Sequence, residues 1–420
     1  MSKATRASYG VLLACTITHF LNHLYTGALS PFLPFIQIEL SLSYTEVGAV
    51  TSAAVIAMTI SHLFVGYLGD KGWRDLFIAV SILGSAVAMI LTSLLSYSFI
   101  FLAIFQFALG VGASGYHPSV FPALSERFGQ RDRAKATGIQ AMGGLIGMAV
   151  TPFLGVTLYI ALGGWRPSLL VLGLLGIVLL FPVTYLMWLG GRDKRNRIEE
   201  TLLNGESEEE EEDGAEGWTR NYWLGLVNMG LRGMSFRCAS LLMPVYLVAT
   251  YPVSPIWAGY LTTIMMVSGL VGEMFSSWYS DHINRRVIFL VVSSALVTPA
   301  FLLLNFALNE VALIVVLIII GFFFFLGVPP NTAYLTEVSP KGKKGIAFGL
   351  LFSVGSIPGA VSPIIFGMIG DAYGLPASIM FLVTTTLLST IVAIFMRDVN
   401  GGEARPSCPT SPPVEEIALE

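Results

Sequence analysis

The stretch GYLGDKGWR at residues 66–74 has a counterpart, SSWYSDHINRR, at residues 276–286. Their aspartates, Asp70 and Asp281, lie 211 residues apart, and the same shift places further residues on residues of the same type: Gly110 on Gly321, Pro118 on Pro329, Glu126 on Glu337 and Gly138 on Gly349. A shift kept over this length indicates a parallel internal repeat. The chain therefore consists of two halves with the same order of elements.

The composition places most of each half in a membrane. Of 420 residues, 54% are hydrophobic and 12% are charged, whereas soluble domains carry charge at roughly 25% of positions. Because a span takes about 20 apolar residues, the hydropathy predicts twelve spans, near 9–36, 46–69, 75–95, 98–124, 136–160, 168–189, 221–249, 256–279, 287–306, 311–335, 344–370 and 377–396. We expect an all-α, polytopic membrane protein with six spans in each half.

The charged residues predict the orientation and the domain boundaries. The two chain ends and the loops on one side of the spans contain 20 of the 23 lysines and arginines, and such loops usually face the cytoplasm. Both termini are therefore expected in the cytoplasm, in the cell (plasma or inner) membrane. We expect an N-terminal bundle (1–189), an acidic cytoplasmic linker (190–220), a C-terminal bundle (221–397) and a disordered tail (398–420).

The paired loops resemble the signature G-x-L-x-D-R-x-G-R-R of the major facilitator superfamily of transporters. The first copy lacks one residue after Lys71, and the second has Ser277 in place of the leading glycine. The resemblance implies two six-helix bundles around a central cavity, and a cytoplasmic gate in which the aspartate faces a helix N-terminus and the arginine pairs with a glutamate. The implied gate residues are Asp70, Arg74, Glu126, Asp281, Arg285 or Arg286, and Glu337; plain anchoring charge at the membrane edge is the alternative.

Further stretches resemble more specific motifs of that family. The fifth span resembles its antiporter motif, although glycine seams also serve close helix packing; the residues concerned are Gly138, Gly147, Thr151, Pro152 and Gly155. THFLNHLY at 18–25 and GASGYHPS at 112–119 resemble the fosmidomycin-resistance-like efflux branch. GVGASG at 110–115 has the spacing of a dinucleotide-binding loop, but it lies inside a predicted span, so no cofactor is expected.

Polar residues within the spans are the candidates for a substrate and proton pathway, because polar groups in hydrocarbon are costly unless they are paired or face water. In the first span they recur at three- and four-residue steps and so share one helical face. This face is expected to line a cavity, with a buried structural hydrogen-bond network as the alternative. The candidates are His19, Asn22, His23, Thr26, Gln106, Tyr116, His117, Asn228, Arg232, Arg237, Glu273, Asn331 and Tyr334.

The histidines are candidates for proton coupling, because imidazole is the side chain that titrates near neutral pH. His117 is the first candidate, followed by His19 and His23, and a structural role is the alternative for each. A metal site is not expected, since no carboxylate or cysteine joins the pair of His19 and His23 in the sequence.

Two arginines and one glutamate fall inside the seventh and eighth spans. Arg232 and Glu273 are expected to form a buried ion pair, because they lie at similar depths on antiparallel helices. Arg237 is five residues further on, or about 140° around the helix, so it does not share a face with Arg232. One of the two arginines is therefore expected to be free for an anionic solute.

The sequence thus predicts a secondary transporter of a small organic solute, anionic or polar, that works by alternating access. Proton-coupled export is the leading interpretation, with proton-coupled uptake or uniport as the first alternative. A transporter-like sensor or scaffold that uses the acidic linker is the alternative from another class. We expect no enzyme activity, no nucleic-acid partner, since the net charge is −4, and a monomer in the lipid bilayer.

Overall fold

The computed structural model describes residues 6–204, 217–283, 285–341, 350–351 and 355–398. The elements of these residues are helices, as predicted. The first half contains α1 (Arg6–Gly27), η1 (Ser30–Phe32), α2 (Leu33–Leu40), α3 (Tyr44–Leu68), η2 (Gly69–Trp73), α4 (Arg74–Leu95), α5 (Phe99–Ala113), α6 (His117–Ser125), α7 (Gln130–Leu162) and α8 (Trp165–Asn204). The second contains α9 (Arg220–Thr250), α10 (Pro255–Ile283), α11 (Val287–Leu303), α12 (Glu310–Leu326), α13 (Val328–Val338), α15 (Ile357–Tyr373) and α16 (Leu375–Ile394).

The helices have the lengths that a membrane requires. Within the described ranges, nine helical segments are long and apolar enough to cross a membrane, and α11 and α15 are shorter apolar helices. α1 carries the polar residues noted above. α8 continues to Asn204, so that residues 190–204 of the predicted linker are helical. The acidic run 206–213 and the tail beyond residue 398 lie outside the described residues.

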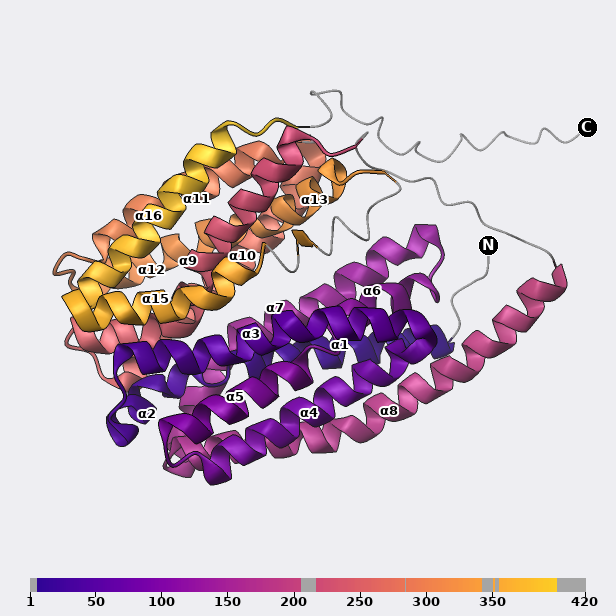
Figure 1. Ribbon diagram of the computed structural model, residues 1–420, viewed down its shortest axis with the longest axis horizontal. Coiled ribbons are helices and arrows are strands. Elements are labelled where there is room, and N and C mark those ends of the chain that lie inside the picture. The colour runs from indigo at the N-terminus through magenta and orange to yellow at the C-terminus, as the bar shows by residue number, and fades with distance from the viewer. Residues whose placement is uncertain (1–5, 205–216, 284, 342–349, 352–354, 399–420) are drawn as a thin grey trace, which may run out of the picture.

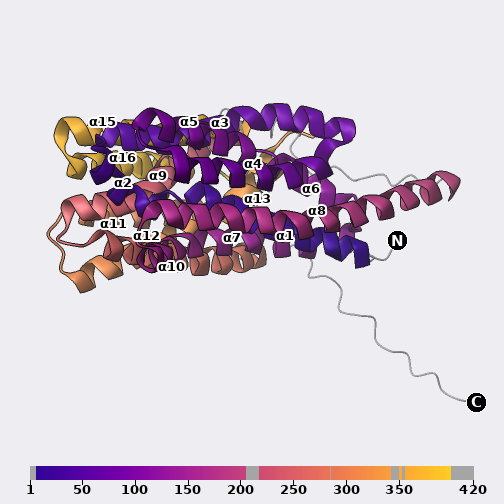
Figure 2. The same cartoon turned by 90° about the horizontal axis from the view of Figure 1, so that it is seen from below.

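The two halves form two bundles that lie side by side, with α1 to α8 in one and α9 to α16 in the other (Figure 1). The ribbons of the two bundles lie close together at the end that holds α2, and they diverge towards the end that holds α6 and α13. The view turned by 90° shows α8 running past its own bundle at this second end (Figure 2). We call these ends the α2 end and the linker end.

Contacts between the bundles gather towards the α2 end. Ser30 Oγ donates a hydrogen bond to the Leu241 carbonyl, at 2.8 Å. A Cβ on Gly48 would lie 2.0 Å from the carbonyl oxygen of Pro363, so α3 and α15 touch through their backbones. Among the described residues, all the hydrogen bonds that join the two bundles lie towards the α2 end.

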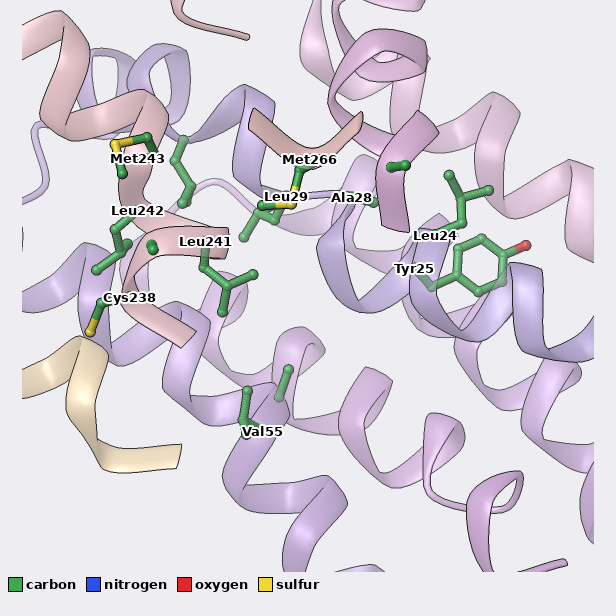
Figure 3. Packing of buried hydrophobic residues seen from close by; sticks show 14 of the residues in the cluster. Leu24, Tyr25, Ala28, Leu29, Val55, Cys238, Leu241, Leu242, Met243 and Met266 are labelled. Atoms are coloured by element: carbon green, nitrogen blue, oxygen red, sulfur yellow. The ribbon is translucent and has the colours of Figure 1, made fainter. Parts of the chain in front are cut away.

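The same region is sealed by apolar side chains. Ala28 and Leu29 of the first bundle belong to one cluster of buried residues with Leu241 of α9 and Met266 of α10 (Figure 3). Buried apolar side chains that pack together leave little room for water or solute. The described conformation is therefore closed at the α2 end.

Glycines bring the helices within each bundle into close contact. A Cβ on Gly143 or Gly147 of α7 would lie 2.4 Å from a carbonyl oxygen of α1 in either case. In α5, a Cβ on Gly110 would lie 2.0 Å from the carbonyl oxygen of Ala54 in α3. The glycine spacing of residues 110–115 therefore serves helix packing, as small residues do in membrane bundles.

The fourth and tenth spans, predicted near 98–124 and 311–335, are confirmed as Phe99–Ser125 and Glu310–Val338, and a short turn interrupts the helix in each of them. α5 ends at Ala113 and α6 begins at His117, while α12 ends at Leu326 and α13 begins at Val328. Both second helices have proline in their first turn, where it is tolerated because it lacks an N–H. Hydropathy does not detect such breaks, since the residues on both sides stay apolar. In transporters, paired breaks of this kind mark the binding region.

Candidate functional site

Four of the five histidines of the chain lie together near the break in the fourth span. His19 and His23 come from α1, with ring centroids 4.9 Å apart. His117, the first residue of α6, lies 5.4 Å from His19 and 5.8 Å from His23. His62 of α3 lies 6.0 Å from His117. We call these four residues the histidine cluster; His62 was not among the predicted candidates.

The surrounding residues fix the orientation of the His19 ring. Its Nδ1 lies 2.9 Å from the carbonyl oxygen of Gln140 in α7, and the ring stacks on Tyr116 at 4.9 Å. The Tyr116 hydroxyl lies 2.7 Å from Gln140 Oε1 and 2.9 Å from the Cys15 carbonyl oxygen. A Cβ on Gly144 would lie 2.5 Å from the His19 ring, so this glycine provides the space for the imidazole.

Arg237 of α9, in the other bundle, lies within electrostatic range of the histidine cluster. It lies close enough to act electrostatically on His23, His62 and His117. The guanidinium has no hydrogen-bond or ion-pair partner among the described residues, and the side chain is only partly buried. A guanidinium has five N–H donors in a planar fork that matches a carboxylate or sulfonate. Such a group inside a membrane bundle is suited to bind an anion.

Arg232 has a structural environment, and the predicted Arg232–Glu273 ion pair is wrong. Arg232 is 8% exposed, and its guanidinium donates to the hydroxyls of Ser293 and Ser294, at 2.7 and 2.9 Å, and to the Phe324 carbonyl, at 2.9 Å. These partners come from α11 and α12, towards which this face of α9 is turned. Glu273 of α10 has no hydrogen-bond or ion-pair partner among the described residues.

The remaining predicted pathway residues are divided between the break and the helix interfaces. Asn22 Nδ2 donates to the carbonyl of Ala113, the last residue of α5, at 2.8 Å, and so caps the broken helix. Thr26 donates to the Asn22 carbonyl within α1, at 2.9 Å. Of the other four, Gln106 contacts Thr92 of α4, Asn228 contacts Ser389 of α16, and Asn331 and Tyr334 lie in α13.

Comparison with known proteins assigns the architecture to a family. The model of the Major Facilitator Superfamily matches residues 15–363, with a second match over residues 225–413. The chain belongs to the Major Facilitator Superfamily. The all-α prediction and the prediction of two pseudo-symmetric bundles are therefore confirmed.

Relatives in this superfamily are transporters of organic solutes. The chain is 24% identical to a Cupriavidus necator protein named Probable sulfoacetate transporter SauU, over 97% of this chain and 100% of that protein. It is 23% identical to the hexuronate transporter of Bacillus subtilis, over 94% of this chain and 96% of that protein. It is 24% identical to the fosmidomycin resistance protein of Escherichia coli, over 87% of each. Because these identities are similar, they do not single out the predicted fosmidomycin-resistance-like branch.

A solved structure has the same fold. It is a bacterial homolog of the human lysosomal transporter Spinster, in an inward-facing and occupied conformation. The TM-score is 0.74 at 17% sequence identity, over 93% of this chain and 96% of that chain. At this identity the likeness concerns the fold alone.

The gate motif of the superfamily forms ion pairs within each bundle. Arg74 Nη1 lies 2.8 Å from Glu126 Oε1, between the start of α4 and the end of α6. In the second bundle, Arg286 Nε lies 3.3 Å from Glu337 Oε1, and Arg285 is exposed. The side chains of Asp70 and Asp281 lie outside the described residues.

The antiporter-like stretch of this superfamily member serves contacts with α1 and η1. Gly147 packs on the Phe20 backbone, Gly155 packs on Pro31, and a Cβ on Gly27 would lie 3.4 Å from the Thr151 side chain. Pro152 lies inside α7. Gly138 differs, because a Cβ there would have no neighbour within 4 Å. In this structure the antiporter-like stretch of α7 therefore serves close helix packing.

Proposed function

We propose that the chain is a secondary active transporter of a small organic anion, which it exchanges for protons by alternating access. The observation that carries the proposal is Arg237. It is a cation in the membrane-spanning part of α9, without a described partner, and it lies within electrostatic range of the histidine cluster of the other bundle. A lone guanidinium there is costly unless an anion compensates it.

The relatives support an anion as the solute. Three of them are named as transporters of sulfoacetate, hexuronate and galactonate. The carboxylate and sulfonate groups of these anions accept paired hydrogen bonds from a guanidinium. Arg237 lies in one bundle and the histidine cluster in the other. An anion held between them would therefore contact both halves of the transporter at once.

The contacts between the bundles support alternating access. The α2 end is closed by backbone packing and by hydrogen bonds such as that of Ser30 to Leu241. With the orientation expected from the basic residues, the closed α2 end would face away from the cytoplasm. Transport requires these contacts to break while new ones form at the linker end.

Glu273 is the group to which we assign proton binding. It is a carboxyl inside a membrane-spanning helix, and it lacks a described partner that would stabilise its charge. A protonated carboxyl is neutral and far less costly in such surroundings than a carboxylate. Proton uptake and release at Glu273 can therefore be coupled to the movement of the anion in the opposite direction.

Reconstituted vesicles test the function and its direction of coupling. The purified chain would be tested with radiolabelled sulfoacetate and galactonate under an imposed pH gradient. Antiport predicts accumulation when the vesicle interior is acidic, and symport predicts accumulation when the exterior is acidic. Uniport predicts no dependence on the gradient. The absence of flux for every organic anion tested would contradict transport of this substrate class.

Glu273→Gln is expected to uncouple transport from protons. In the parent, one pH unit can drive about tenfold accumulation per exchanged proton, since it corresponds to roughly 1.4 kcal/mol. In the variant, accumulation should fall to the level without a gradient, because the amide cannot titrate, whereas exchange of labelled for unlabelled anion persists. Glu310→Gln, at the exposed start of α12, is the matched control and should retain accumulation. Full accumulation by Glu273→Gln would refute this assignment.

A further inference from the structure

The histidine cluster has the composition of a transition-metal site. The ligand nitrogens of His19, His23 and His117 all lie within 4.8 Å of one another. They come from α1 and from the first residue of α6, so the break in the fourth span brings the third ligand to the other two. His62 Nε2 is buried beside them and has no hydrogen-bond partner among the described residues.

The surroundings of His19 match those of a metal ligand. Metal-binding histidines usually donate their second ring N–H to a carbonyl or a carboxylate, which fixes the tautomer and the ring orientation. His19 Nδ1 contacts the Gln140 carbonyl at 2.9 Å, which leaves Nε2 as the free ligand atom. Gly144 lies against the side of the ring that carries Nε2 and keeps it free of a side chain.

The distances can close with small movements. A zinc–nitrogen bond measures about 2.0–2.1 Å, so two nitrogens on a tetrahedral ion lie roughly 3.3 Å apart. The nitrogens at up to 4.8 Å need to approach by about 1.5 Å or less. His23 and His117 have no described hydrogen bond that would hold their rings in place, so changes of side-chain torsion angles suffice.

The imidazole ligands determine which class of metal ion can bind, and Arg237 favours binding of that ion together with an anion. Three imidazoles suit Zn²⁺, Co²⁺, Ni²⁺ or Cu²⁺ and not Mg²⁺ or Ca²⁺, which take oxygen ligands. Three protein ligands leave the fourth position of a tetrahedral ion open. Arg237 disfavours a bare cation near the cluster and attracts an anion. A metal ion would therefore bind best together with an anionic ligand that also contacts Arg237.

We propose that His19, His23 and His117 form a binding site for a divalent transition-metal ion, whose open position accepts an oxygen of the organic anion held by Arg237. The metal component stands independently of the proposed function, whereas the anion component rests on it. The sequence had predicted no metal site, because that prediction considered only the two histidines of the first span.

Cobalt spectroscopy on the purified full-length chain tests the metal component. Four-coordinate Co²⁺ gives intense visible absorption bands, and Zn²⁺ should displace it and abolish them. His117→Ala is expected to weaken Co²⁺ binding by at least about tenfold, the lower bound for loss of a supporting residue at a metal site. His282→Ala is the matched control and should not change binding, because His282 stacks on Trp278 away from the cluster.

Gly144→Ala provides a second variant that keeps all ligands. Its added methyl group must displace the His19 ring, so Co²⁺ binding should weaken here too, while thermal unfolding reports whether the fold survives. The absence of Co²⁺ bands in the parent would overturn the site. Equal weakening by His117→Ala and His282→Ala would also overturn it.

Sulfoacetate, used as the probe anion, tests the second component. It should tighten Co²⁺ binding by the parent and shift the absorption bands. Arg237→Gln should bind Co²⁺ alone more tightly than the parent and lose the response to sulfoacetate. If vesicles transport the anion but no Co²⁺ binds, this inference fails and the proposed function stands. If Co²⁺ binds but no anion is transported, the proposed function fails and the metal site stands.

Discussion

Replacing Arg237 with glutamine is expected to lower the transport rate of a small organic anion by at least about 100-fold, without unfolding the chain. Removing one partner from a buried pair of opposite charges costs about 2–5 kcal/mol, and roughly 2.8 kcal/mol corresponds to that factor. Because Arg237 has no described partner within the protein, its removal leaves no protein group unpaired. Exchange of labelled anion in vesicles measures the rate, and thermal unfolding measures the stability.

Arg232→Gln is the matched control on the same helix. Arg232 donates to Ser293, Ser294 and the Phe324 carbonyl, so its loss leaves buried acceptors without a donor. Each such group costs about 1–3 kcal/mol, and we expect a clear fall in the unfolding temperature. The account would be contradicted if Arg237→Gln transported anions at the parent rate, or if it lowered stability as much as Arg232→Gln.

Replacing Asp371 with asparagine is expected to open the α2 end. Asp371, which follows the predicted span 344–370, accepts hydrogen bonds from the backbone N–H groups of Tyr44 and Thr45, both at 2.8 Å, and from the Thr45 hydroxyl at 2.5 Å. These groups form the first turn of α3, so the carboxylate of one bundle caps a helix N-terminus of the other, where negative charge is favourable. The contact therefore acts as a latch between the bundles.

The latch is expected to hold throughout the physiological pH range. Burial raises the pKa of the Asp371 carboxyl, but the hydrogen bonds from Thr45 and Tyr44 outweigh this effect and lower the pKa below its ordinary value of 3.8. A lowered pKa means that the stabilisation is complete above the ordinary value and is lost only as the pH falls through the lowered one. The proposed proton coupling near neutral pH must therefore involve groups other than Asp371.

Asp371→Asn should shift the equilibrium towards an open α2 end by about tenfold, or roughly 1.4 kcal/mol, after allowance for solvent screening of an exposed group. Double electron–electron resonance measures this shift as a change in the distance distribution between spin labels at Ile38 and Val311, which are both highly exposed at this end. Thr45→Val removes only the hydroxyl contact and should give a smaller shift. An unchanged distance distribution in Asp371→Asn would show that the latch does not hold the bundles.

The fold was largely predictable because its signals are local or periodic. Apolar runs define spans without knowledge of their neighbours, and the shift between Asp70 and Asp281 exposes the repeat. The breaks before His117 and Val328 were not predicted, because the apolar runs continue across them. Asp371 was missed because helix capping across two bundles joins residues 326 and 327 positions apart in the chain.

The site was predictable only in part, since it depends on how helices rotate against one another. His19, His23 and His117 were recognised as polar residues within spans, and their convergence follows from the packing of α1 against the break. His62 is the single histidine of the second span, and no motif or helical periodicity in the sequence marks it as a candidate. The partners of Arg232 lie 61, 62 and 92 residues away, and no helical period relates these positions to it.

The central claim is that an anion held at Arg237 draws the two bundles together at the linker end. Spin labels at Lys135, near the start of α7, and at Arg285, just after α10, report on this end, and both positions are exposed. Saturating concentrations of a transported anion should shorten the distance between them in the parent and leave it unchanged in Arg237→Gln. A distance that does not respond to any transported anion, or that shortens equally in the variant, would contradict the account.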